Sequence, residues 1–223
     1  MSSDVEALRH IPLFATLSQE ELERVAALAV KRHYDRGDII LLEGDMAGAL
    51  HYVHSGLVKV YKTSPGGKDQ VLRLIAAGNT FNDVPTLDGG PNPASAAALE
   101  PSIIYVISRT ELCKLILTRP EVAEAVVKTL ADALRHLVSL VEDLSLRHVT
   151  ARVAKILLEQ EASIREGRYV YHMTQQEMAA LAGTAREVVG RALKELETAG
   201  AIEMHQGRAV VVKSERLRLL SSG

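Results

Sequence analysis

Three charged side chains gather near the start of one predicted helix, and their types suit the reading of base pairs. Arg186, Glu187 and Arg191 fall on adjacent rows of the helix surface, with the small Gly190 between them. An arginine fork can donate to O6 and N7 of guanine, and a carboxylate can accept from N4 of cytosine. The pattern predicts a face that enters the major groove of DNA. A surface ion pair between Glu187 and Arg191, worth a few tenths of a kcal/mol, is the alternative interpretation.

Two helices separated by a glycine must position these side chains. The sequence predicts helices over residues 174–182 and 186–196, with Gly183 ending the first. Thr174 followed by Glu177, and Thr184 followed by Glu187, both match the capping box of a helix start. A helix, a tight glycine turn and a second helix form the helix-turn-helix plan. The apolar side chains expected to pack the pair together are Met178, Leu181, Val189, Leu193 and Leu196.

A short β-hairpin is predicted after the second helix. Residues 201–205 and 208–212 read as strands on either side of Gln206-Gly207, which is a turn-like pair. Helix-turn-helix plus hairpin makes a winged helix. This segment resembles the DNA-binding domain of the Crp/Fnr family of bacterial transcription regulators. That family reads DNA with an Arg-Glu-x-x-x-Arg helix, which Arg186, Glu187 and Arg191 match position for position.

The resemblance implies a homodimer on double-stranded DNA. A twofold protein predicts a palindromic operator, and the matched recognition helix implies half-sites resembling TGTGA. If the protein is an activator, RNA polymerase is expected as a further partner. The side chains expected to contact phosphates, because they lie at helix starts or beside the reading face, are Thr174, Gln175, Thr184 and Lys194.

Length and composition limit the other classes of function. A chain of 223 residues suggests one or two domains, and its single Cys113 excludes a disulfide framework and a four-cysteine iron–sulfur cluster. No stretch approaches the roughly 18 uncharged apolar residues that span a membrane, so the expected setting is the cytoplasm with no membrane partner. Residues 148–223 hold 11 basic and 9 acidic side chains, a net +2, against −2 for the whole chain. The mild basic excess lies in the predicted DNA-binding segment.

Residues 34–108 read as short strands separated by glycine turns, which favours a sandwich or barrel. With Gly37-Asp38, Glu43-Gly44-Asp45 and Ser55-Gly56, this region resembles the cyclic-nucleotide-binding β-roll of the same family. The expected fold class is therefore α+β. The expected domains are a β-roll sensor with flanking helices over 1–118, a dimerisation helix over 119–147 and a winged helix-turn-helix over 148–223.

The predicted long helix carries an apolar seam. Apolar residues from Ala123 onward alternate steps of four and three, the 3.5-residue repeat of a two-stranded coiled coil. A helix buried in the monomer's own core is the alternative. The side chains expected at the dimer seam are Val127, Leu130, Leu134, Leu137, Val141 and Leu144.

The expected effector pocket departs from the cyclic-nucleotide pattern. The family's phosphate pocket reads Phe-x-Gly-Glu and, further along, Arg-Ser. Laid on Phe81-Asn82-Asp83-Val84, the glycine becomes Asp83 and the carboxylate becomes Val84. On Ala94-Ser95, the arginine is lost and only Ser95 remains. Leu137 and Val138 replace the base-contacting Thr and Ser of the long helix. Because the phosphate loses its cation, no cyclic AMP is expected here.

The identity of the effector stays open from the sequence. An apolar pocket allows haem, as in gas sensors of the family, or a small apolar molecule. The candidate axial ligands are His33, His51, His54 and His136, although none is singled out by its spacing. No phosphate-cradling loop, metal-ligand spacing or nucleophile elbow indicates an enzyme, so no catalytic residue and no metal ligand is expected. A protein-binding module that keeps the fold without sequence-specific DNA binding is the remaining alternative.

Overall fold

The computed structural model describes residues 3–46, 48–167, 171–206 and 208–221. The chain divides into two compact units. The first comprises residues 1–62 and 73–135, and the second comprises residues 63–72 and 136–223. The α+β class expected from the sequence is confirmed: a β-rich domain, a long helix and a helical domain with a small hairpin.

The first unit is built around two sheets. One sheet has the strand order β1-β8-β3-β6 and the other has β2-β7-β4-β5. In the first sheet β3 and β8 are antiparallel, with Leu50 opposite Ile107 and Tyr52 opposite Tyr105. The strands are β1 (Val30–Tyr34), β2 (Ile39–Leu41), β3 (Ala49–Ser55), β4 (Leu57–Thr63), β5 (Asp69–Ala76), β6 (Thr80–Phe81), β7 (Ser95–Ala98) and β8 (Ser102–Ser108).

Apolar side chains from both sheets meet in the interior of the roll. Val53 and Ile104 come from the first sheet, and Val58, Ile75 and Ala96 from the second. A second cluster fixes the helices of this unit to the outer face of the first sheet, with Phe14, Leu22, Leu112 and Val122 almost fully buried. The helices are α1 (Ser3–Arg9), η1 (Pro12–Phe14), α2 (Gln19–Leu28), α3 (Asp83–Asp88), α4 (Arg109–Thr118) and the start of α5 (Pro120–Leu146).

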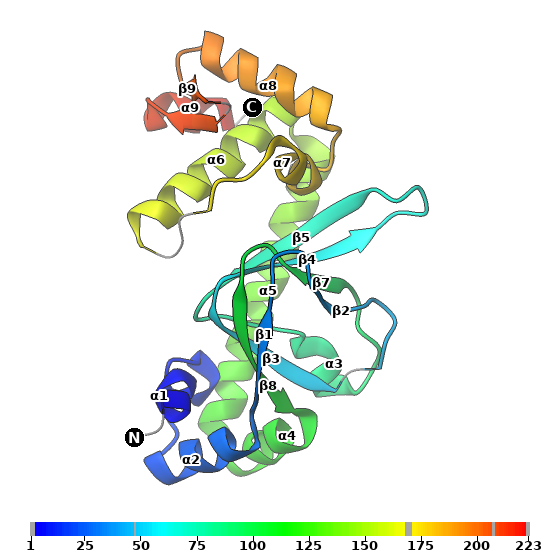
Figure 1. Ribbon diagram of the computed structural model, residues 1–223, viewed down its shortest axis with the longest axis vertical. Helices are drawn as coiled ribbons and strands as arrows, with labels where there is room; N and C mark the ends of the chain where they lie inside the picture. Colours follow the sequence, from blue (N-terminus) through cyan, green and yellow to red (C-terminus); the bar gives the residue numbers. More distant parts are fainter. Residues whose placement is uncertain (1–2, 47, 168–170, 207, 222–223) are drawn as a thin grey trace. The chain divides into compact units, whose positions relative to one another are not determined.

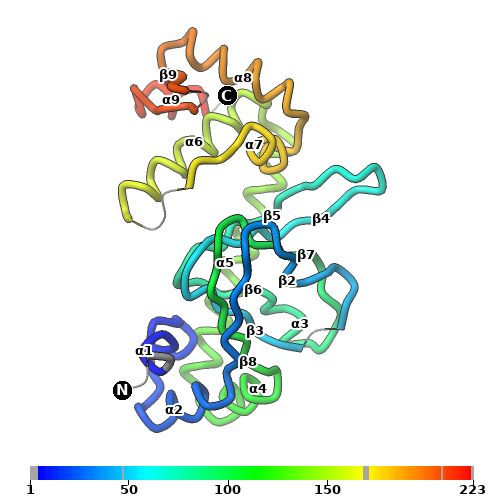
Figure 2. The backbone as a smooth tube through the Cα atoms, viewed as in Figure 1, coloured from blue at the N-terminus to red at the C-terminus, as the bar shows by residue number. Residues whose placement is uncertain are grey.

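The second unit consists of helices and a small antiparallel hairpin (Figure 1). Helix α6 packs against α7, α8 and α9, and β9 pairs with β10 so that Ile202 lies opposite Val211. Residues 63–72 at the tip of the β4–β5 hairpin, cyan in Figure 2, also belong to this unit. Its remaining elements are α6 (Val149–Arg165), α7 (Gln175–Ala182), α8 (Arg186–Thr198), β9 (Ile202–His205), β10 (Arg208–Val211) and α9 (Ser214–Ser221).

Two details of the predicted helix starts are corrected. The N-cap of α8 is Ala185, which makes no side-chain cap, so the predicted Thr184–Glu187 capping box is wrong. Thr184 lies one residue before the actual N-cap position, because the extended Ala185 separates it from the first residue of α8. Ser108 followed by Glu111 also matches a capping box in the sequence, but only one half of it forms at α4, where Ser108 Oγ accepts from the Glu111 N–H at 3.4 Å.

Five elements were not predicted from the sequence: η1, β1, β6, α3 and α9. β1 is mostly polar and exposed, and it forms because its backbone pairs with β8. The two-residue β6 exists only as a partner of β3. Residues 83–88, which the sequence did not predict as a helix, form the short α3, and its Pro85 is tolerated because it lies in the first turn. Of the predicted Gln206-Gly207 turn, Gly207 lies outside the described residues, and Gln206 has φ +50°.

Candidate nucleic-acid interface and small-molecule cavity

Helix α7 begins and ends as its sequence predicts. Thr174 Oγ1 accepts from the Glu177 N–H at 3.2 Å, and Glu177 Oε2 accepts from the Thr174 N–H at 2.7 Å, so the predicted capping box is confirmed. Tyr171 donates its hydroxyl proton to the same glutamate. Gly183 ends the helix in the left-handed conformation at φ +63°. These contacts fix the angle at which the chain enters α8.

Helix α8 has one buried face and one charged face. Val189, Leu193 and Leu196 are buried against the rest of the second unit. Arg186, Glu187 and Arg191 lie on the opposite side and are exposed. Within the described residues, none of these three side chains makes a hydrogen bond or ion pair, so the Glu187–Arg191 surface pair does not form. The groups stay available for a partner outside the chain.

The residues predicted to contact phosphate lie around this face. Lys194 is exposed on α8, and Gln175 is half-buried in the first turn of α7, its Oε1 3.7 Å from the position that a Cβ on Gly190 would take. Thr174 uses its hydroxyl in the capping box. Thr184 is half-buried, and its N–H donates to the Ala179 carbonyl at 3.0 Å.

Sequence reasoning missed the residue that braces the turn between α7 and α8. Arg152 Nε donates to the Ala182 carbonyl at 2.8 Å, and its Nη1 donates to the Arg147 carbonyl at 2.8 Å. The guanidinium therefore satisfies a carbonyl at the C-terminus of α7 that has no partner within that helix. Its position on α6 gave no signal, because a half-buried arginine on an amphipathic helix cannot be told from a solvated one by sequence.

The first unit contains a cavity of about 120 Å³ between the strands of the second sheet and α3. Three of the predicted effector residues, Asn82, Asp83 and Val84, line it, whereas Ser95 does not. Ser95 Oγ instead accepts from the Glu43 N–H at 3.0 Å. Leu137 and Val138 belong to the second unit, and their role stays a prediction. The lining residues are Leu41, Val60, Arg73, Ile75, Phe81, Asn82, Asp83, Val84, Pro85, Pro93, Ala94 and Ala96.

The backbone conformation of Asn82 shifts the alignment of this segment with the cyclic-nucleotide pattern by one residue. It precedes α3 with φ +66°, in the left-handed region that favours glycine and tolerates asparagine. Asn82 is therefore a better counterpart of the family's glycine than Asp83, and Asp83 a better counterpart of its carboxylate than Val84. The position of the arginine is still occupied by Ala94, so the cation expected for a cyclic phosphate is still missing there.

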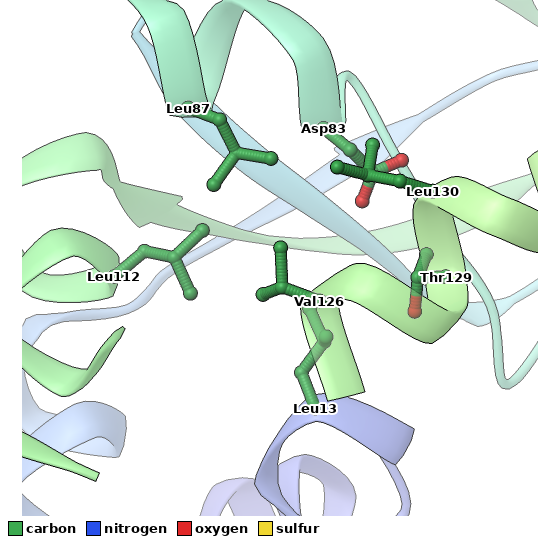
Figure 3. Close-up of a pocket in the computed structure, with 7 residues that line it drawn as sticks. All are labelled: Leu13, Asp83, Leu87, Leu112, Val126, Thr129 and Leu130. Carbon is green, nitrogen blue, oxygen red and sulfur yellow. The ribbon is translucent and has the colours of Figure 1, made fainter. Parts of the chain in front are cut away.

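Asp83 lies between two cavities. It also lines an apolar space of about 10 Å³, the room of roughly one water, together with Leu13, Leu87, Leu112, Val126, Thr129 and Leu130 (Figure 3). Thr80 Oγ1 donates to Asp83 Oδ1 at 3.1 Å. Burial raises the pKa of the Asp83 carboxyl, while the Thr80 hydrogen bond and the Arg73 charge oppose this shift. One carboxyl thus faces both the larger cavity and the start of α5.

The histidines considered as haem ligands do not line the larger cavity. His33 and His54 are exposed, and His136 Nε2 lies 2.9 Å from the Leu72 carbonyl. His51 is buried against Phe81, with its Nδ1 3.1 Å from the Ala49 carbonyl. A porphyrin needs an axial ligand and far more room than about 120 Å³. The residues present do not fit haem in this cavity.

The predicted seam on α5 is exposed at every position but one. Leu130 is half-buried against the helical cluster of the first unit, beside the buried Val122 and Val126, which are not seam residues. The other five predicted seam residues, exposed in the single chain, are Val127, Leu134, Leu137, Val141 and Leu144. Val138 and Leu146 on the same helix are exposed as well.

Among the described residues no group of three or more His, Cys, Asp or Glu side chains could hold a metal ion. In the same residues, no helix is long and apolar enough to cross a membrane.

Known proteins match this chain over nearly its whole length. Residues 31–119 match the family described as cyclic nucleotide-binding domain, and residues 151–220 match the Crp-like helix-turn-helix domain. The cyclic AMP receptor protein of Thermus thermophilus is 33% identical over 213 residues, which covers 95% of this chain and 97% of the relative. The CRP-like cAMP-activated global transcriptional regulator of Mycobacterium tuberculosis is 31% identical over 189 residues, 82% of this chain and 84% of that protein.

Solved structures give the same result. FixK2 from Bradyrhizobium japonicum matches with a TM-score of 0.75 at 25% identity, covering 87% of this chain and 98% of that one. Together, the β-roll and the Crp-like helix-turn-helix define a class of DNA-binding transcription regulators. This chain belongs to that class as a member of the Crp/Fnr family.

Proposed function

We propose that this regulator binds a palindromic operator as a homodimer, with TGTGA-like half-sites read by α8. The observation that carries the proposal is the exposed, unpaired state of Arg186, Glu187 and Arg191 within the described residues. A charged face that is not neutralised within its own unit is suited to donate and accept at base edges. Two of its relatives are named as global transcriptional regulators.

The phosphate contacts are proposed on either side of this face. The first turn of α7 has N–H groups without partners in the helix, and such a helix start favours an anion. Gln175 lies in that turn, while Lys194 extends from the exposed side of α8. Thr184 lies just before α8, and we propose that it contacts phosphate through its hydroxyl, since its N–H already donates to the Ala179 carbonyl. The hydroxyl and N–H of Thr174 are both engaged with Glu177, so we propose that Thr174 acts by fixing the start of α7 beside the phosphate.

The dimer is proposed through the exposed apolar side chains of α5. A single chain with so many large apolar groups on one helix needs a partner to cover them. Their 3.5-residue spacing suits a second copy of the same helix. We propose that the protein acts in the cytoplasm, with RNA polymerase as a partner where it activates.

The effector is proposed to bind in the cavity of about 120 Å³ and to differ from cyclic AMP. Several relatives are named as cyclic-AMP-activated, so this is a point on which the chain would depart from them. The support is Ala94 at the position of the phosphate-binding arginine and the small volume of the cavity.

The base-reading proposal is tested with two single variants, Arg186→Ala and Arg191→Ala. We measure binding by fluorescence anisotropy to a palindrome with half-site centres one helical turn (~10.5 bp) apart, and to a scrambled duplex. Each variant should weaken palindrome binding by about 1–3 kcal/mol and lose the preference for the palindrome.

Arg165→Ala removes an exposed arginine from α6 and serves as the matched control, with unchanged binding expected. Equal weakening on both duplexes would show that the two arginines contact phosphate only. If the wild-type protein does not prefer the palindrome over the scrambled duplex, the fold serves as a protein-binding module instead.

A further inference from the structure

The cavity of the first unit contains one positive and one negative side chain. Arg73 extends from β5 and Asp83 from the start of α3, and both line the space. No ion pair within 4.0 Å joins Arg73 to an acidic group of the described residues. The two charges nevertheless interact, because Arg73 lowers the pKa of Asp83. Arg73 and Asp83 therefore line the same cavity with opposite charges but do not form an ion pair with each other.

The rest of the lining is predominantly apolar. Leu41, Val60, Ile75 and Phe81 form the wall from the strands, and Pro85 and Pro93 close the side of α3 and its following loop. A ligand in this cavity meets one cation, one anion and hydrocarbon. Because the two charges cancel, the cavity favours a ligand whose own charges also cancel.

Size limits the ligand further. An engineered cavity of about 150 Å³ holds benzene, and drug-sized sites begin near 300 Å³. The cavity of about 120 Å³ therefore holds a group the size of a short branched hydrocarbon chain. A purine with its ribose and phosphate would extend out of it into solvent.

We propose that this cavity binds a small apolar α-amino acid in its zwitterionic form, with the carboxylate on Arg73 and the ammonium on Asp83. The aliphatic side chain then packs against Ile75 and Phe81. This inference rests on the proposed function, since it names the effector of the same regulator. Arginine suits a carboxylate because its planar fork can donate two parallel hydrogen bonds.

Two other ligand classes fit the charges less well. A cyclic nucleotide brings one negative charge and no positive one, so it could use Arg73 but would leave Asp83 without a cation. A simple aliphatic carboxylate could use Arg73, but it leaves Asp83 without a cation and favours the protonated form of that carboxyl. The protonation of Asp83 therefore distinguishes the zwitterion from the carboxylate.

The groups around Asp83 make this protonation a clear signal. Arg73 from β5 is the charged side chain that acts on it, and Thr80 donates a hydrogen bond. The α5 side chains in the adjoining cavity, Val126, Thr129 and Leu130, carry no charge. Burial holds the carboxyl pKa above its ordinary value, so an ammonium group, which needs the ionised carboxylate, should bind more weakly as the pH falls and Asp83 becomes protonated. A simple carboxylate should bind as well or better when Asp83 loses its charge.

The experiment is isothermal titration calorimetry of the full-length protein at neutral and at mildly acidic pH. The ligands are L-valine, isovalerate (no ammonium), isobutylamine (no carboxylate) and cyclic AMP. At neutral pH L-valine should bind at least tenfold more tightly than each of the other three, and its affinity should fall as the pH is lowered. Equal or tighter binding of isovalerate or cyclic AMP, or no binding of L-valine, would overturn the proposal.

Variants assign the two contacts. Arg73→Gln should weaken L-valine at least tenfold, and Asp83→Asn should weaken L-valine while isovalerate binds as well or better. The matched controls are Arg32→Gln on β1 and Asp88→Asn on α3, both exposed and outside the cavity lining, with no change expected. Palindrome binding by the wild-type protein is measured separately. Loss of the amino-acid effect with palindrome preference intact rejects the inference and leaves the proposed function standing.

Discussion

His51 is a neutral imidazole kept from water by the strands around it. Its side chain is 4% exposed, and its ring lies 5.0 Å from that of Phe81. Burial lowers the pKa of His51, with the contact to the Ala49 carbonyl opposing the shift and the nearby Arg32 charge adding to it, so that the pKa falls from its ordinary 6.5 to about 4. Protonation of His51 is unfavourable in the folded protein, so it lowers the free energy of unfolding.

The stability of the first unit should therefore fall in mild acid. Below pH 6.5 the unfolded chain binds a proton at His51, whereas the folded chain binds it only near pH 4. The contribution is present above pH 6.5 and is lost between pH 6.5 and about 4; it corresponds to about 3 kcal/mol. Urea unfolding at a series of pH values measures it.

His51→Gln should remove this part of the pH dependence, because glutamine does not titrate. His54→Gln, at an exposed position on the same strand, should keep it. Parallel stability curves for the wild-type protein and His51→Gln would contradict the prediction.

At the scale of elements, helices were easier to predict than strands and short turns. The local apolar periods of α5, α6, α7 and α8 predict these helices, the capping box of α7 forms as predicted, and the face of α8 follows from i, i+4 spacing alone. β1, β6 and α3 depend on partners distant in sequence. Arg73 was missed as a cavity residue because a cation in an apolar strand gives no local signal of the space that it faces. The unpaired state of the α8 charges could be decided only from coordinates.

The turn between α7 and α8 depends on the missing side chain of Gly183. A Cβ there would lie 2.7 Å from Leu144 Cδ2 and 2.8 Å from Gln70 Oε1. Gln70 Nε2 also donates to the Leu181 carbonyl at 3.3 Å, so the tip of the β4–β5 hairpin contacts the end of α7 within the second unit.

Gly183→Ala should destabilise the second unit by more than its backbone strain. A left-handed alanine costs about 1 kcal/mol, and displacing the two neighbouring side chains adds to it. Gly200→Ala is the matched control, since Gly200 has φ +66° and its Cβ would meet nothing closer than 3.8 Å. Thermal unfolding compares them. An equal loss of stability in both variants would show that the contacts with Leu144 and Gln70 contribute nothing.

At the scale of the whole molecule, the exposed apolar residues of α5 decide whether the regulator works in pairs. Val141 is 63% exposed and Leu134 is 63% exposed, on a helix of 27 residues. The two units fold around their own cores, so covering this stripe is not needed for either core. Pairing and folding should therefore be separable by mutation.

Val141→Glu should yield a folded monomer with weak operator binding. A carboxylate cannot be buried in an apolar seam without a large cost, and loss of the second recognition helix should weaken palindrome binding at least tenfold, about 1.4 kcal/mol or more. Analytical ultracentrifugation and fluorescence anisotropy measure the two effects. Leu219→Glu, 77% exposed on α9, is the control and should stay dimeric. A dimeric Val141→Glu with full affinity would refute the seam.

The exposed apolar residues of α5 and the charged residues of α8 can be substituted independently, and this has a genetic consequence. A copy carrying Arg186→Ala and Arg191→Ala keeps every apolar residue of α5, so it should still associate with normal copies. Each mixed dimer then contains one subunit that can contact the bases and one that cannot. In a cell that makes both, the defective allele should be dominant-negative, and adding Val141→Glu to it should make it recessive.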